Sequence, residues 1–205
     1  MIIPNLYTVI IETKKGEYIK IYEDDDGIHY NKNNIDSLID KTNIKINLYK
    51  FNDQKYENIK RVLYGEILFN IKDNIIYPNI LVYDKPWYRD AAIASMVLEK
   101  TNNTDLITEW INKITDIYDY QNKGNMEPDN LGELLYLIST QKNIRTDLVE
   151  KIEKEANKIA KNNHKGYYLN GTTDFKEMYL YQNLWYKLGA EKLGKKFKFN
   201  IDRLS

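Results

Sequence analysis

The sequence predicts a mainly α-helical chain that begins with a small β-rich lead-in. Apolar residues recur with a period of about two in the first fifty residues, and with a period of 3.6 from residue 54 onward. These are the periods of strands and of helices. The connections between the helical segments are mostly short, which makes successive helices antiparallel neighbours. We therefore expect residues 1–53 to form the lead-in and residues 54–205 to form α-helical hairpins.

The lead-in is expected to contain one hairpin and one further strand. Residues 7–11 and 18–22 are β-branched and aromatic runs on either side of a polar turn that contains Gly16. This pattern predicts an antiparallel hairpin over residues 6–23, packed against the helical part. The acidic run before Gly27 predicts a second, solvated turn, because it lacks the residue spacing of a calcium loop. Alternation over residues 44–51 predicts one more strand.

The helical part is expected to contain six helices of two kinds. The first, third and fifth carry long charged faces that suit contact with water, whereas the second, fourth and sixth are poorer in charge and suit burial on two sides. The low-charge helices are therefore expected inside and the charged helices outside. The predicted ranges are 54–70, 88–100, 104–121, 129–140, 145–163 and 174–190.

The three low-charge helices begin in a similar way, each with an aspartate in its first residues. Asp129 follows Asp90 by 39 positions, and Asp174 follows Asp129 by 45. This spacing suits a repeating helical hairpin. If the hairpins stack side by side, the three acidic helix starts lie together at one edge of the stack, which we call the rim.

These helix starts have two interpretations. An aspartate at a helix start accepts hydrogen bonds from free backbone N–H groups and complements the helix dipole, which is a purely structural role. Their neighbours favour a second interpretation, a site for sugars, because sugars bind through aromatic faces together with carboxylates, amides and arginine. On this interpretation the substrate-binding residues are Trp87, Tyr88, Arg89, Asp129 and Asn130.

Two of these segments also carry a resemblance. Trp-Tyr-Arg-Asp-Ala-Ala at residues 87–92, Glu-Pro-Asp-Asn-Leu-Gly at residues 127–132 and the alternating helices look like the six-hairpin, (α/α)₆-toroid glycosidase superfamily. The resemblance implies that the helical hairpins form part of an α/α toroid. A complete toroid has twelve helices and six are expected here, so we expect a chain truncated at its C-terminus or an open half-ring.

The resulting hypothesis is a carbohydrate-active, glycoside hydrolase-like protein. Hydrolysis of a glycosidic bond usually needs two carboxyl groups, one of which donates a proton. Glu127 is the first candidate for that general acid because burial in its loop would raise its pKa, and Asp174 or Asp90 is its expected partner. The alternative is a non-catalytic helical-repeat domain that binds a cell-surface polysaccharide or a protein partner on the same rim.

The amino-acid composition also limits which partners, metals and cofactors we expect. Thirty basic and thirty acidic residues cancel, which argues against a nucleic-acid partner. The chain has no cysteine and only two, widely separated histidines, so we expect neither a metal site nor a cofactor. No apolar run is long enough to span a membrane. We expect a soluble bacterial protein, either cytoplasmic or exported by a leader missing from this sequence.

Overall fold

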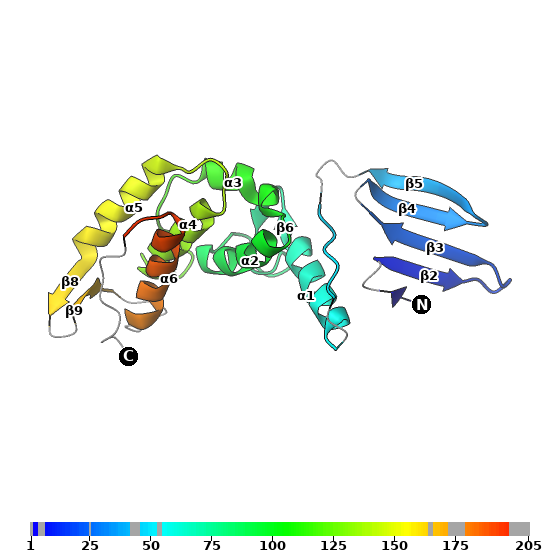
Figure 1. Ribbon diagram of the computed structural model, residues 1–205, viewed down its shortest axis with the longest axis horizontal. Helices are drawn as coiled ribbons and strands as arrows, with labels where there is room; N and C mark the ends of the chain where they lie inside the picture. Colours follow the sequence, from blue (N-terminus) through cyan, green and yellow to red (C-terminus); the bar gives the residue numbers. More distant parts are fainter. Residues whose placement is uncertain are drawn as a thin grey trace.

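The computed structural model describes residues 2–3, 7–24, 26–41, 46–52, 55–163, 166–171 and 179–196. The described chain is a mixed α/β structure in which an antiparallel sheet precedes a series of helices (Figure 1). The expected order, strands first and helices afterwards, is confirmed, although the β-rich part is larger than expected. Figure 1 shows no closed ring among the described helices.

The sheet is a simple antiparallel meander. Its strands pair in chain order, and the predicted hairpin over residues 6–23 is confirmed by the pairing of the second strand with the third, which places Ile10 opposite Lys20. The bounds are β1 (Ile2–Ile3), β2 (Thr8–Glu12), β3 (Tyr18–Glu23), β4 (Gly27–Lys32) and β5 (Ile35–Lys41).

The two strands β4 and β5 are absent from the sequence prediction. They are joined by Asn33 and Asn34, whose φ angles of 54° and 62° lie in the left-handed region that two-residue hairpin turns require. The predicted turn before Gly27 is confirmed, since Asp24 Oδ1 accepts hydrogen bonds from the backbone N–H groups of Asp26 and Gly27. The predicted strand over residues 44–51 is wrong for its described part, because residues 46–52 form no strand.

Strand β5 ends the sheet and all seven of its residues are exposed. Asp36 and Asp40 lie on this edge. Charged side chains on an edge strand oppose pairing with another chain.

The helices largely follow the predicted ranges. Two ranges differ. The predicted helix 145–163 is too long, because it ends at Ile159 and residues 160–163 form a strand that pairs with residues 166–169. In the range 104–121, a short 3-10 helix and one short α-helix end at Lys113. Ile114 has extended backbone, which ends the helix, and both Ile114 and Tyr118 are buried in the core beyond that end. The bounds are α1 (Glu57–Phe69), β6 (Ile71–Lys72), β7 (Ile75–Ile76), α2 (Tyr88–Lys100), η2 (Thr104–Ile107), α3 (Thr108–Lys113), α4 (Asp129–Ser139), α5 (Thr146–Ile159), β8 (Ala160–Asn163), β9 (Gly166–Leu169) and α6 (Tyr179–Lys192).

Helix α4 is the centre of the core. Every residue from Asp129 to Ile138 is buried, whereas α5 buries only one face, which includes Leu148 and Ile152. Helix α2 also buries more of its residues than α5 does. The expected inner position of the second and fourth helices, and the outer position of the fifth, are therefore confirmed.

Helices α4 and α6 approach closely because each has a glycine at the contact. A Cβ atom on Gly132 would lie closer than 3.0 Å to backbone atoms of Trp185 and Tyr186. A Cβ atom on Gly189 would be equally close to Leu135 and to the backbone of Tyr136. Because these two glycines have no side chain, the helices can pack closer together than other residues would allow.

Tyr7, which directly precedes β2, contacts α1 and so joins the sheet to the helical part. The Arg61 guanidinium lies 3.5 Å from the centroid of the Tyr7 ring, and the Tyr7 hydroxyl donates to the carbonyl of Tyr49 at 2.7 Å. The Tyr64 hydroxyl donates to the carbonyl of Asn47 at 2.6 Å, which holds the connecting segment against α1. Among the described residues, no helix has the length and apolarity needed to cross a membrane.

The close contact between α4 and α6 predicts that replacing glycine by alanine has very different effects on stability at two positions. Gly132→Ala should lower the free energy of unfolding by at least about 2 kcal/mol, because the added methyl group meets rigid backbone. Gly65→Ala in α1 should change it by less than about 1 kcal/mol, since its nearest neighbour is the movable end of Arg61. Urea denaturation of both variants measures this; equal losses would contradict the close-contact interpretation.

The sheet contains a pH-dependent contact at His29. Its Nδ1 lies 2.9 Å from Asp36 and its Nε2 lies 3.1 Å from Asp24, so a protonated ring donates to both carboxylates. The hydrogen bond with Asp36 is the main reason that the pKa of His29 is raised above 6.5. The stabilisation is therefore full below pH 6.5 and is lost as the pH rises through the folded-state pKa.

An NMR titration of the histidine ring protons checks this expectation. His29 should titrate above 6.5 in the wild-type protein, and Asp36→Asn should move its pKa downward. A His29 pKa at or below 6.5 in the folded wild-type protein would refute the paired geometry.

Candidate functional site

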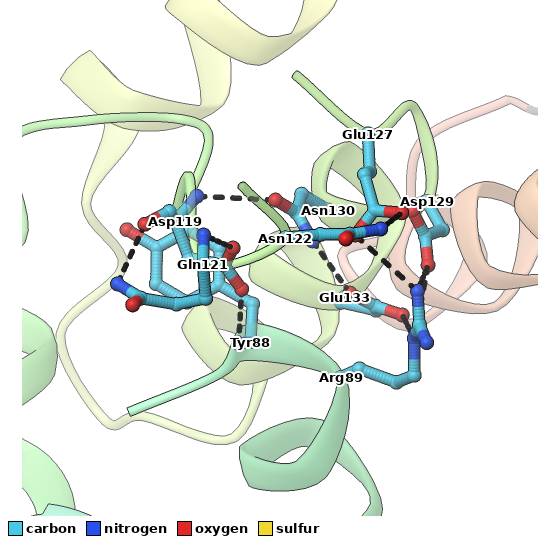
Figure 2. Close-up of polar contacts among 9 residues, drawn as sticks. All are labelled: Tyr88, Arg89, Asp119, Gln121, Asn122, Glu127, Asp129, Asn130 and Glu133. Carbon is cyan, nitrogen blue, oxygen red and sulfur yellow. Dashed lines mark hydrogen bonds and ion pairs between the residues drawn. The ribbon is translucent and has the colours of Figure 1, made fainter. Parts of the chain in front are cut away.

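The polar residues around Arg89 form a connected, mostly buried group, which we call the Arg89 cluster and define as Arg89, Asn122, Glu127, Asp129, Asn130 and Glu133. Figure 2 shows these side chains converging from the start of α2, the loop before α4 and the first turns of α4. Within the described chain, the cluster brings together the starts of two helices that the sequence analysis placed on one rim.

Arg89 connects α2 to α4 through carboxyl groups. Its Nη2 donates to Asp129 Oδ2 at 2.9 Å and its Nε donates to the same oxygen at 3.2 Å. Nη2 also lies 3.5 Å from Glu127 Oε2. Glu127 and Asp129 are almost completely buried, whereas the Arg89 side chain keeps 20% of its surface exposed. The cluster therefore reaches solvent through Arg89.

Glu133 is the least compensated of the three carboxyl groups. It is fully buried, Oε2 accepts from Asn130 Nδ2 at 3.1 Å, and Oε1 accepts no hydrogen bond within the described structure. The nearest cationic atom to Oε1 is Arg89 Nε at 3.8 Å. Burial, followed by the negative charge of Asp129, raises the pKa of Glu133 well above 4.5. Glu133 thus favours its protonated form while Asp129 is paired with the cation.

The two α4 carboxyl groups are close neighbours. Asp129 and Glu133 are four residues apart and lie on one face of the helix. One oxygen of each lies within 4 Å of Arg89 Nε, so these two oxygens are no more than about 7 Å apart. Two adjacent carboxyl groups in different environments are a usual arrangement for acid–base chemistry.

Amide side chains extend the network to a second loop. Asn122 Nδ2 donates to Glu127 Oε1 at 3.0 Å. Asn130 Oδ1 accepts from the backbone N–H of Asp119 at 3.1 Å, and Asp119 Oδ2 accepts from the backbone N–H of Tyr88 at 2.7 Å (Figure 2). Burial raises the pKa of Asp119. The loop before α4 is therefore fastened to the starts of both α2 and α4.

The aromatic residues predicted to bind sugar have different positions. Tyr88 is buried, its hydroxyl donates to the carbonyl of Asp116 at 2.8 Å, and its ring lies beside Trp110. Trp87 is partly exposed and makes an edge contact with Tyr83. In the described chain Trp87 therefore presents more ring surface to solvent than Tyr88 does.

The structure separates Asp90 from the Arg89 cluster. Asp90 lines a cavity between α1, β7 and α2, which none of the residues of the Arg89 cluster lines. Asp174 lies outside the described residues, so its predicted position on the rim stays a prediction. The N-cap residues of α2 and α4 are Trp87 and Pro128, and neither makes a side-chain capping bond.

Sequence reasoning missed Glu133, Asp119, Asn122 and Tyr181. The Arg89 guanidinium lies 5.8 Å from the Tyr181 ring centroid, and burial raises the pKa of Tyr181 to about 12. A signal for Glu133 was present, because it is the one charged residue in the apolar run from Leu131 to Ile138. No sequence signal marked Asp119 or Asn122, because polar residues are common in loops such as the one before α4.

No group of three or more metal-ligating side chains arranged to hold a metal ion occurs among the described residues. No protein-family model, curated protein or solved structure matches the chain. The arguments for function therefore come from the Arg89 cluster and from the sequence resemblance.

The raised pKa of Glu133 predicts a pH-dependent stability. Because the folded state binds this proton more tightly than the unfolded chain, the contribution of Glu133 is largest below pH 4.5 and is lost as the pH rises through the folded-state pKa. The stability of the wild-type protein relative to Glu133→Gln should therefore decrease with increasing pH.

Urea denaturation between about pH 4 and pH 8 measures this difference. Glu109→Gln is the matched control, because Glu109 is exposed on α3 and pairs with Lys113. The difference between the wild-type protein and E109Q should vary much less with pH. A pH-independent difference between the wild-type protein and E133Q would show that Glu133 is not buried as described.

Proposed function

We propose that the chain is a carbohydrate-active, glycoside hydrolase-like domain whose reactive carboxyl groups belong to the Arg89 cluster. The observation that carries the proposal is the pair of neighbouring carboxyl groups in different environments, Asp129 hydrogen-bonded to Arg89 and Glu133 without a hydrogen bond on Oε1. The helices would form part of an α/α toroid, as the resemblance implies. Carbohydrate is the expected ligand class.

The proposed chemistry assigns a role to each carboxyl group. Burial raises the pKa of Glu133, so this carboxyl group keeps its proton to a higher pH than an ordinary glutamate and would donate it to the leaving oxygen of a glycosidic bond. Glu127 accepts hydrogen bonds from Asn122 and Arg89, which suits the ionised partner that completes the reaction. This exchanges the role predicted for Glu127 from the sequence, and the two assignments are separable by experiment.

Arg89 is the positioning group of the proposal. It binds Asp129 and Glu127 at the same time, so both carboxylates keep a fixed orientation. Its exposed part, together with Trp87, supplies the hydrogen-bonding and aromatic surface that a sugar would contact first. The predicted roles of Asp90 and Asp174 remain predictions.

One observation favours the non-catalytic alternative. The side chains of Asp129 and Glu133 have no exposed surface and that of Glu127 has 3%. Carboxyl groups so deeply placed also serve to hold α2 and α4 together. On that alternative the chain binds a polysaccharide or a protein partner on its surface and performs no hydrolysis.

A hydrolysis screen and a glycan array on the same protein separate the two functions. For a hydrolase, Glu133→Gln and Glu127→Gln should each reduce kcat by at least about 100-fold while leaving glycan binding intact, because the change removes an ionisable proton with little change in shape. If Glu133 is the proton donor, the loss in E133Q should be smaller for substrates whose leaving groups need no protonation.

Glu109→Gln serves again as the control, since it removes an exposed carboxyl group that does not belong to the Arg89 cluster. It should keep wild-type turnover. Glycan binding without turnover by the wild-type protein would support the non-catalytic alternative, and unchanged turnover in both E127Q and E133Q would refute the roles proposed for the cluster.

A further inference from the structure

A cavity lies apart from the Arg89 cluster. It has a volume of about 170 Å³ and lies between the end of α1, the strand β7 and the start of α2. Cavities of about 150 Å³ hold a ligand the size of benzene. Ile93, which is 53% exposed, borders it, so the cavity opens to solvent. It has the size and access needed for a small organic ligand.

The walls of this cavity are mainly aliphatic, and three polar residues complete them. Asn70 is already occupied, because its Oδ1 accepts from the backbone N–H of Ile80 at 3.0 Å. Tyr77 and Asp90 are the other two. The apolar lining residues are Ile67, Ile76, Pro78, Ile93, Ala94 and Val97.

Asp90 is the charged group of the cavity. Among the described residues its carboxyl group makes no ion pair and no hydrogen bond to another side chain, and it accepts a hydrogen bond from the backbone N–H of Asp90 itself. Burial raises the pKa of Asp90, and the positive charge of Arg89 only partly opposes this effect. The carboxyl group has therefore lost part of its hydration, and the backbone N–H of its own residue replaces only part of it.

Neighbouring charges leave this carboxyl group available to a ligand. Arg89 precedes Asp90 in the chain, yet its guanidinium is bound to Asp129 and Glu127 on the α4 side. The start of α2 carries only the partial positive charge of the helix dipole, which a full carboxylate charge outweighs. A cation in the cavity would thus meet a net negative field beside aliphatic walls.

We propose that this cavity binds a small aliphatic primary amine. The alkyl chain lies along Ile93, Ala94 and Val97, and the ammonium group pairs with the Asp90 carboxylate. Apolar walls select the alkyl chain, and the single carboxyl group selects the positive charge. This site is separate from the Arg89 cluster and does not depend on the proposed function.

Binding of n-butylammonium and of n-butanol, followed through the NMR signal of the Ile93 methyl groups, tests the proposal. The two probes have similar alkyl chains and differ in charge. The wild-type protein should bind butylammonium at least 10-fold more tightly than butanol, and added salt should weaken only the binding of butylammonium. Equal binding of the two probes, or a preference for butylammonium that salt does not reduce, would overturn the proposal.

Two variants sharpen the test. Asp90→Asn should reduce the preference for butylammonium to about one, because it removes the charge and keeps the size of the side chain. Ala94→Leu should weaken both probes by filling the cavity. Persistence of the 10-fold preference in D90N would refute the role of Asp90. If D90N does not fold, the charge and salt dependence in the wild-type protein still decide the matter.

Discussion

The packing of the helical part depends on the ion pairs between Arg89 and the carboxyl groups of the α4 region. Arg89 is the cation that meets Glu127, Asp129 and Glu133, and it joins the start of α2 to the start of α4. Buried charges are costly unless they are paired, so removal of the guanidinium would leave three carboxyl groups to be neutralised by protons. The raised pKa of Glu133, which burial causes, favours the same kind of compensation by a proton.

This arrangement allows α4 to be buried on all sides although it carries two acidic residues. Arg89 and Asn130 satisfy the acidic groups on one side of the helix. On another side, Gly132 permits the close approach of α6. The central helix thus combines a polar contact and a close backbone contact, and this combination brings Tyr181 of α6 near the Arg89 guanidinium.

Much of this organisation follows from local patterns in the sequence. The helices 88–100 and 129–139 are marked by their apolar periodicity, and the first hairpin by its β-branched runs. Strands β4 and β5 were missed because the Asn33-Asn34 turn lacks the glycine usual at such turns. The helix 104–121 is predicted too long because Ile111, Ile114 and Tyr118 keep the helical spacing and no proline or glycine before Gly124 marks the end of α3 at Lys113.

The candidate site was likewise only partly predictable from local sequence patterns. Sequence patterns placed Arg89, Glu127, Asp129 and Asn130 near one another, and the structure brings these residues together. The direction of Asp90 was not predictable from its neighbour. Consecutive residues on a helix point about 100° apart, so Arg89 and Asp90 serve different surfaces.

The exposed edge of the sheet has a consequence for the behaviour of the protein at high concentration. Two copies that paired antiparallel through β5, centred on Leu38, would place Asp36 of one copy opposite Asp40 of the other on both sides of the centre. Like charges directly opposite each other destabilise a strand pair. When His29 loses its proton, Asp36 loses its positive neighbour and this repulsion increases. Growth of the sheet from one molecule to the next is therefore opposed most strongly at alkaline pH.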